Sequence, residues 1–228
     1  MISIYAAQGF TRFHPLTGYL GGTVAEFVAG TEWPDGVEVE CVPTGLDTPT
    51  GGRILAAREA AGEGTFCVTY ADGVADIDLD ALLEFHAGHG RTATMTAVRP
   101  HLGWGVLDLD GDGAVTGFRE KPRSEHWING GFFCFEPAAF DRLGPDAVLE
   151  RDPLESLAAT DQLRAFRHEG FWDCMDTYKD LLTLNDLWDR GEAPWLASPE
   201  DEPTGDRLAP LDPDEVPDPS TVIFEDSR

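Results

Sequence analysis

The segment TFCVTYADGVADIDL, residues Thr65–Leu79, decides the fold, because a β-branched and aromatic run passes directly into Ala71-Asp72-Gly73. Residues Thr65–Tyr70 predict a buried strand, and the acids that follow favour a helix over Leu79–His89. In open α/β sheets, ligands bind outside the carboxyl ends of strands. Asp72 is therefore placed to hold a metal ion or a sugar, although the motif taken alone favours a plain Asp-Gly turn.

The same alternation of strand and helix extends over most of the chain. Apolar and β-branched runs predict strands at 10–16, 37–42, 92–98, 128–135 and 163–168, and helical patterns fall at 24–28, 53–61, 79–89, 137–143, 153–159 and 179–188. Residues 105–109 and 114–118 flank an Asp/Gly-rich turn and predict a hairpin. Strands that alternate with helices indicate an α/β protein with a mostly parallel sheet.

Composition divides the chain into two parts. Residues 1–195 form the predicted α/β domain, whereas residues 196–228 are rich in proline and acids and have almost no hydrophobic periodicity. Such a composition favours a disordered acidic tail. The first part therefore carries the fold and the site.

Charge and cysteine content restrict the partners and the compartment. Asp and Glu number 42 against 16 Lys and Arg, which gives a formal net charge of -26. A charge of this sign repels nucleic acid and anionic lipid, so we expect neither as a partner. The four cysteines have no paired spacing, and no apolar run is long enough to cross a bilayer. We therefore expect a cytoplasmic protein with reduced thiols and no membrane association.

Three further segments carry chemistry that a phosphate or sugar ligand needs. Asp176 lies in the loop 172–177, where it could cap the last helix or join Asp72 in holding Mg²⁺, which binds through one or two carboxylates plus water and substrate phosphates. Lys121 lies in the densest basic patch, where it suits a phosphate, with an exposed surface cluster as the alternative. Asn129 and Gly130 begin an aromatic strand, and there Asn129 could bind sugar hydroxyls, with a β-bulge as the alternative.

The Gly/Thr-rich loop before the helix at 53–61 is a candidate anion site. Residues Thr44–Arg53 offer backbone N–H groups and an arginine at the start of a helix. The loop lacks the GK[ST] ending of a Walker P-loop, so it is not that motif.

Taken together, these segments resemble the sugar-1-phosphate nucleotidyltransferases, and most closely the glucose-1-phosphate cytidylyltransferases. The resemblance covers about residues 1–195 and lies in an ordered set of motifs: TGLDTPTGGR (44–53), TYADGVADIDL (69–79), FHAGHGRTATMTA (85–97), FREKP (118–122), INGGFF (128–133), GFWDCMDT (170–177) and LWDRGEAPW (187–195). It implies a Rossmann-like sheet and an oligomeric enzyme.

The resemblance also implies a reaction and a set of roles. CTP and a hexose 1-phosphate, glucose 1-phosphate, would give CDP-glucose and pyrophosphate, with Asp72 and Asp176 as the Mg²⁺ carboxylates and Lys121 on the sugar phosphate. It further implies that Thr48, Arg53 and the backbone at Ala71 contact the nucleotide, and that Asn129 and Gly130 orient the hexose. The alternative is a catalytically impaired relative that binds sugar phosphate or nucleotide and acts with a partner.

The chain departs from the family pattern at its start. The family opens with a strand, a Gly-Gly-x-Gly-Thr-Arg loop and a Lys-Pro segment, and Met1 aligns only within the helix that follows. Because the first strand of such a sheet is central, its loss would leave a gap with unpaired edges and few donors for the triphosphate. We therefore expect a fold that misses its first βα element and a poorly active chain. A start recorded too late is one explanation of this departure.

Overall fold

The main sheet is built around β4 (Phe66–Tyr70), the strand expected from the sequence. The computed structural model describes residues 1–196 and 221–225, and within them the main sheet has eight strands. Its path runs β10 (Leu163–Arg167), β6 (Ala93–Val98), β9 (Ile128–Phe135), β4, β12 (Thr221–Glu225), β1 (Arg12–Thr17) and β2 (Glu38–Val39), with β3 (Val42–Pro43) also paired to β1. The antiparallel pairs in this sheet are those that β9 makes with β4 and β6. The sheet is therefore mostly parallel, and the predicted Rossmann-like α/β class is confirmed.

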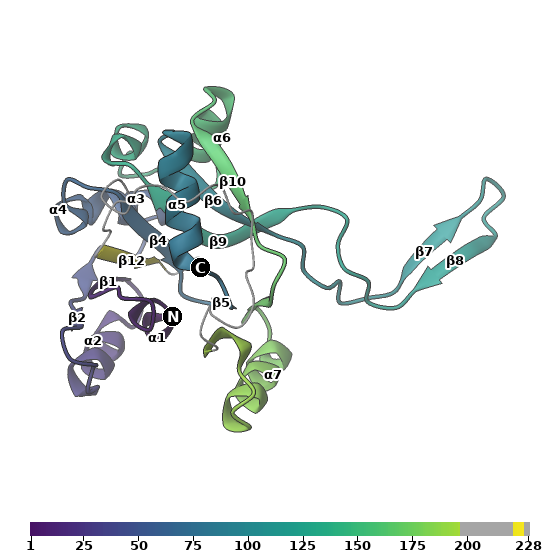
Figure 1. Ribbon diagram of the computed structural model, residues 1–228, viewed down its shortest axis with the longest axis horizontal. Helices are drawn as coiled ribbons and strands as arrows, with labels where there is room; N and C mark the ends of the chain where they lie inside the picture. The colour runs from purple at the N-terminus through teal and green to yellow at the C-terminus, as the bar shows by residue number, and fades with distance from the viewer. Residues whose placement is uncertain (197–220, 226–228) are drawn as a thin grey trace.

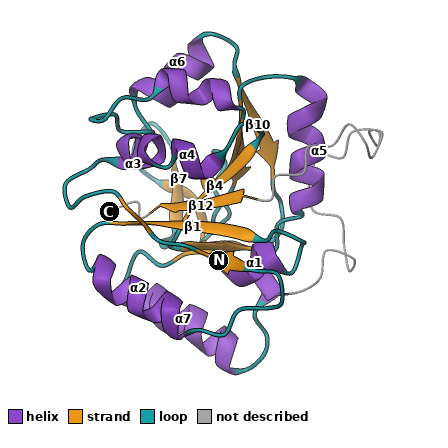
Figure 2. Cartoon of the chain, turned by 90° about the vertical axis from the view of Figure 1, so that its left-hand side faces the viewer, coloured by secondary structure: helices purple, strands orange, loops and turns teal. Residues whose placement is uncertain are grey.

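Helices cover both faces of this sheet (Figures 1 and 2). They are α1 (Ile2–Ala6), α2 (Gly21–Gly30), α3 (Thr50–Ala56), α4 (Arg58–Ala61), α5 (Leu79–His89), α6 (Asp152–Ala159) and α7 (Tyr178–Asp189), with 3-10 turns η1 (Pro137–Arg142) and η2 (Pro194–Leu196). Among the described residues, each helix is too short or too polar to cross a bilayer.

The core has two parts, one on each face of the sheet, because successive side chains of the central strands point to opposite faces. On β9, Phe132 and Cys134 face the core that contains α1 and α5, whereas Phe133 and Phe135 face the core that contains α3, α4 and α6. Successive strand side chains point to opposite faces, so a sheet buried on both sides needs apolar residues at every position. The run from Phe132 to Phe135 meets that need, and the result is a three-layer fold.

Strand β12 fills the place where the sequence predicted a gap. It lies between β1 and β4 and is parallel to both, with Val222 opposite Phe13 and Cys67. Val222 and Phe224 enter one core and Ile223 the other. The prediction that β1 and β4 have unpaired edges is therefore wrong. The prediction that the whole of 196–228 is disordered is also wrong at 221–225, which form a strand. The physical reason is that this run is β-branched and aromatic and satisfies both core faces. Residues 197–220 and 226–228 lie outside the described part, so the tail prediction stays untested there.

Pro15 lies inside β1, where its missing N–H does no harm. The Phe13 carbonyl accepts from Glu40 and the Thr17 carbonyl accepts from Thr44, so the odd residues of β1 face β2 and β3. Pro15 falls between the last pair with β2 and the first pair with β3. The ladder is interrupted at the position where proline has no donor to offer.

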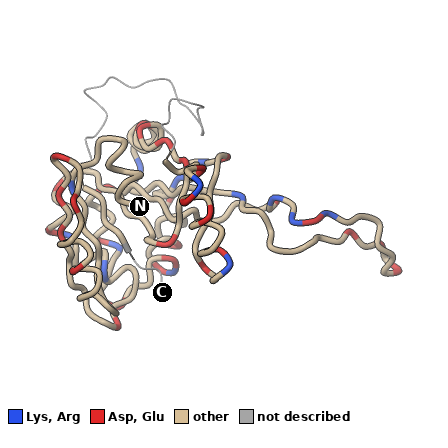
Figure 3. The backbone as a smooth tube through the Cα atoms, turned by 90° about the horizontal axis from the view of Figure 1, so that it is seen from below, with Lys and Arg blue, Asp and Glu red and all other residues tan. Residues whose placement is uncertain are grey.

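Two smaller pairs leave the main sheet. Strands β7 (Val106–Leu109) and β8 (Val115–Arg119) form the predicted hairpin, which projects far from the body (Figure 1). Along the backbone, several Lys and Arg positions lie close together on the part of the hairpin nearest the body, and Asp and Glu positions occur throughout the body and at the hairpin tip (Figure 3). Strands β5 (Gly73–Ala75) and β11 (Trp172–Cys174) pair antiparallel and carry the candidate site.

Candidate functional site

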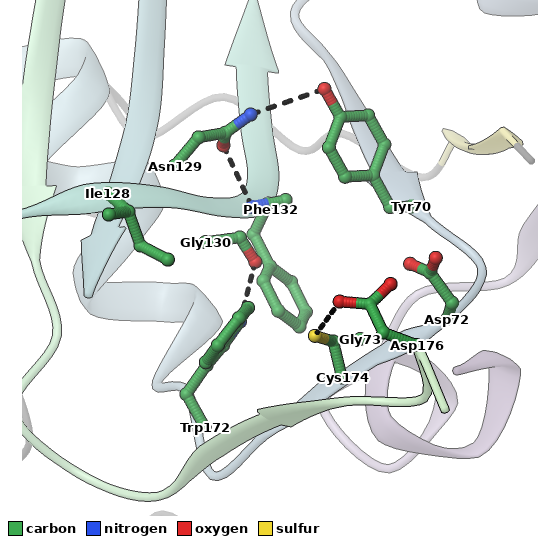
Figure 4. Close-up of a pocket in the computed structure, with 11 residues that line it drawn as sticks. Tyr70, Asp72, Gly73, Ile128, Asn129, Gly130, Phe132, Trp172, Cys174 and Asp176 are labelled. Carbon is green, nitrogen blue, oxygen red and sulfur yellow. Dashed lines mark hydrogen bonds between the residues drawn. The ribbon is translucent and has the colours of Figure 1, made fainter. Parts of the chain in front are cut away.

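Backbone pairing brings Asp72 and Asp176 to the same place. Asp72 follows β4 and precedes β5, and Gly73 of β5 pairs with Cys174 of β11. Beyond that pair, the Met175 N–H donates to the Asp72 carbonyl at 2.8 Å. Asp176 is the next residue, so the ladder that joins β5 to β11 positions the two carboxylates beside each other (Figure 4).

The two aspartates line one cavity of about 230 Å³. Its wall comes from the end of β4, the start of β9 and the β5–β11 pair, and its lining residues are Tyr70, Asp72, Gly73, Ile128, Asn129, Gly130, Gly131, Phe132, Trp172, Cys174 and Asp176. Four of the residues predicted from the sequence, Asp72, Asp176, Asn129 and Gly130, are therefore brought together. The cavity lies beyond the carboxyl end of β4, as expected for an open α/β sheet.

The floor of the cavity requires the two glycines that begin β9. A Cβ at Gly130 would lie 2.9 Å from Val98 Cγ1, and Gly131 has φ +79° with a Cβ position 2.9 Å from Tyr70 Cδ2. Side chains at these positions would collide with their neighbours, and at Gly131 they would also strain the backbone. The Trp172 indole N–H donates to the Gly130 carbonyl at 2.8 Å, which ties β9 to β11.

Asn129 is held by two hydrogen bonds. Its Oδ1 accepts from the Gly131 N–H at 2.9 Å, and its Nδ2 donates to the Tyr70 hydroxyl at 3.2 Å (Figure 4). The amide is therefore oriented at the edge of the cavity before any ligand binds.

Cys174 stays a neutral thiol beside the two carboxylates. Its Sγ donates to Asp176 Oδ2 at 3.1 Å. Burial, then the hydrogen bond and the negative charge of Asp176, raise the pKa of Cys174 to about 12. Burial also raises the pKa of the neighbouring Asp173. A protonated thiol is a poor metal ligand, so the carboxylate oxygens are the strongest donors in this cavity.

This donor set fits Mg²⁺ better than a transition metal. Within residues 1–196 and 221–225, no three His, Cys, Asp or Glu side chains gather as a closed metal site. Mg²⁺ does not need one, because it binds through one or two carboxylates and completes its shell with water and substrate phosphates. Asp72 and Asp176 are the residues that could hold it here.

Lys121 lines an adjoining cavity of about 400 Å³, which shares Trp172 with the first. Lys121 has φ +44°, in the left-handed region that residues other than glycine seldom adopt. Arg99, Arg123 and Lys179 line the same cavity, so it holds both lysines of the chain. Two carboxylates, Asp173 and Asp180, also line it. Lys121 is thus a neighbour of the aspartate cavity and not part of its lining.

The predicted nucleotide contacts Thr48 and Arg53 lie elsewhere in the structure. Thr48 lines a separate surface depression with Pro145 and Asp146, and its hydroxyl donates to the Thr44 carbonyl at 2.5 Å. Arg53 is buried and donates to Thr44 Oγ1 at 2.6 Å. The structure therefore gives both side chains a local partner within the loop before α3. Ala71 is exposed between β4 and Asp72, next to the cavity.

The residues that line the two cavities and that sequence reasoning did not propose as site residues include Tyr70, Trp172, Cys174 and Lys179. Tyr70 and Trp172 were given no role of their own, although they lie inside the quoted motifs 69–79 and 170–177. Proximity to Asp72 and Asp176 was the available signal for Tyr70 and Cys174. No local pattern could place Lys179 beside Lys121, because they come from different elements.

Known proteins resemble this chain over the region that holds both aspartates. A family model described as "Nucleotidyl transferase" matches residues 25–192. The Bacillus subtilis (strain 168) protein named "Probable glucose-1-phosphate cytidylyltransferase" is 36% identical over 216 residues, which covers 86% of this chain and 85% of that protein. The Salmonella typhi glucose-1-phosphate cytidylyltransferase is 44% identical over 160 residues, covering 69% of this chain and 62% of that enzyme.

Solved structures agree on the fold. HddC from Yersinia pseudotuberculosis aligns with a TM-score of 0.64 at 18% identity, over 82% of this chain and 83% of that one. At this identity the likeness supports the Rossmann-like architecture alone.

Proposed function

The chain belongs to the nucleotidyl transferase family, and from this premise we propose that it transfers a cytidylyl group from CTP to glucose 1-phosphate. An oxygen of the sugar phosphate attacks the α-phosphorus of CTP in line, a new P–O bond forms, and the bond to the β-phosphate breaks. The products are CDP-glucose and pyrophosphate. The observation that carries the proposal is the single cavity that holds Asp72, Asp176, Asn129 and Gly130.

Positioning and charge neutralisation are what this chemistry asks of a protein. When bound by Asp72 and Asp176, Mg²⁺ supplies charge neutralisation at the phosphate oxygens. We assign Lys121 to the sugar phosphate, since its cavity adjoins the aspartates and carries two arginines and a second lysine. Asn129 and the backbone at Gly130 orient the hexose from the edge of the aspartate cavity.

The nucleotide side of the proposed site involves Ala71 and the loop before α3. The exposed backbone at Ala71 adjoins Asp72 and can reach the nucleotide. Thr48 and Arg53 would act through the shape of the loop before α3, because their side chains have partners inside that loop. The alternative of an impaired binding protein is not favoured by relatives whose names state cytidylyl transfer. We further propose a cytoplasmic homo-oligomer.

The test is turnover by the purified chain. CTP, glucose 1-phosphate and MgCl₂ are incubated with it, and CDP-glucose and pyrophosphate are quantified by anion-exchange chromatography. We expect both products in equal amounts, and none when EDTA replaces MgCl₂. Parallel reactions with UTP, dTTP, ATP and GTP measure base preference. Faster turnover with another nucleotide, or none with any, would overturn the proposal.

A further inference from the structure

A chain of hydrogen bonds runs from the cavity to the start of α3. The Tyr70 hydroxyl contacts both Asn129 Nδ2, at 3.2 Å, and Glu150 Oε1. The other carboxylate oxygen of Glu150 accepts from the Thr50 hydroxyl at 2.9 Å, and Thr50 Oγ1 itself accepts from the Leu149 N–H at 2.7 Å. Four residues from separate parts of the sequence are thereby linked, and Figure 4 shows the end of this chain at Asn129 and Tyr70.

Each bond in the chain has only one direction that satisfies every group. An ionised carboxylate has no proton to donate, so Glu150 accepts from both hydroxyls. The Tyr70 O–H is thereby used, and only its lone pairs remain for Asn129. An acceptor at that point requires the NH₂ of Asn129, which turns its Oδ1 toward the Gly131 N–H at 2.9 Å. The Gly131 N–H, which can only donate, and the Tyr70 oxygen, which Glu150 leaves as an acceptor, therefore hold the Asn129 amide in the same orientation from its two ends.

We propose that Tyr70 and Glu150 are positioning residues that fix the Asn129 amide for hexose recognition, an inference that rests on the proposed function. With its orientation fixed, Asn129 presents one remaining N–H and one remaining lone pair from defined positions. If the Asn129 amide were reversed, its NH₂ group would take the place of its oxygen, and a sugar hydroxyl would meet a donor instead of an acceptor. The Tyr70–Glu150 pair thus contributes to hexose specificity without touching the reacting phosphates.

The arrangement can be probed without dismantling the fold. The Tyr70 ring packs against Phe133 with centroids 5.6 Å apart, and Tyr70→Phe keeps that ring while it removes the hydroxyl. Glu150 is exposed, so Glu150→Gln changes its charge and hydrogen-bonding pattern and buries nothing new. The amide that Glu150→Gln introduces could donate to the Tyr70 oxygen, which would disturb the directions of the chain.

The experiment measures steady-state constants for both substrates. In Tyr70→Phe and Glu150→Gln we expect the KM for glucose 1-phosphate to rise about 5- to 10-fold, the change expected for roughly one hydrogen bond. The KM for CTP and the melting temperature should stay close to those of the unmodified chain. The double variant should be no worse than Tyr70→Phe, because both changes break the same chain. Tyr178→Phe and Glu155→Gln, at an exposed tyrosine on α7 and an acid on α6, are matched controls.

A second readout needs no turnover. The side-chain NH₂ resonances of Asn129 in ¹⁵N-labelled protein should move in Tyr70→Phe and in Glu150→Gln, and should not move in either control. Unmoved resonances overturn the positioning role, whatever the reaction is. Equal changes in both KM values, or a lowered melting temperature with unchanged KM, would also overturn it. Moved resonances in a chain that makes no CDP-glucose would instead refute the proposed function and leave the orientation of Asn129 by Tyr70 and Glu150 supported.

Discussion

At the scale of single residues, the Asp72–Asp176 pair is the feature on which the proposed chemistry depends. Both carboxylates line one cavity, beside a thiol that stays protonated. We predict that Asp72→Asn or Asp176→Asn lowers kcat by at least about 100-fold, because each removes a negative ligand for the cation that neutralises the phosphates. The Mg²⁺ concentration for half-maximal rate should rise as well. Initial rates at saturating substrates over a MgCl₂ titration measure both.

The control for this pair is Asp141→Asn, at an exposed acid on η1. It changes the charge by the same amount at a residue that lines neither cavity, so its rate should match that of the unmodified chain. Rates within a factor of two for Asp72→Asn or Asp176→Asn would remove the metal role from these residues.

Some site residues could be predicted from the sequence and others could not, and the reason is physical. Asp72 and Asn129 each lie beside a strand end, and a strand end has a known place in an α/β sheet. Arg53 was expected to face an anion, but a buried arginine needs local acceptors, and Thr44 supplies one. The link between Tyr70 and Glu150 joins residues eighty positions apart. No local pattern encodes such a contact.

At the scale of elements, the packing of β12 into the sheet can be tested by measuring how a substitution in this strand changes the free energy of unfolding. Ile223 is fully buried and packs in the core with α3, α4 and α6. We predict that Ile223→Ala lowers the free energy of unfolding by about 2–5 kcal/mol, the usual cost of truncating a buried aliphatic side chain. Urea unfolding followed by circular dichroism measures it. Leu182→Ala, at an exposed position on α7, should change the value by less than about 0.5 kcal/mol. Equal small effects at both sites would mean that β12 is not docked in solution.

The main-sheet strands that the sequence identified differ in their surroundings from β12, which it missed. The periodicity of 65–70, 92–98 and 128–135 is flanked by turn residues, so each run stands out as a strand. The run 221–225 follows a long proline-rich and acidic stretch. The composition of that stretch led to a prediction of disorder for the whole tail, although five residues within it form a strand. Its partners, β1 and β4, lie more than 150 positions away. Pairing at that separation depends on the whole sheet, which a window along the sequence does not see.

At the scale of the whole molecule, two features have opposite effects on self-association: the extended hairpin exposes apolar side chains, and the chain carries a large negative charge. Trp104, Leu107, Leu109, Val115 and Phe118 are exposed on or beside β7 and β8, an unusual concentration of apolar side chains for a monomer. Burying them between copies would be favourable, whereas a net charge of -26 on each copy opposes close approach. Added salt shortens the reach of that repulsion from about 30 Å at 0.01 M to about 8 Å at 0.15 M.

We therefore predict that the chain self-associates through the hairpin and does so more strongly as salt increases. Light scattering after size-exclusion chromatography should give a mass above the 24.8 kDa of one chain at 200 mM NaCl, and a lower mass at 10 mM NaCl. Leu107→Glu with Phe118→Glu should shift the mass toward that of one chain, because two new charges would be buried without partners. Leu182→Glu, at an exposed position on α7, should leave it unchanged. A single-chain mass at every salt concentration would contradict association, and an oligomer that survives the double substitution would place its interface on another surface.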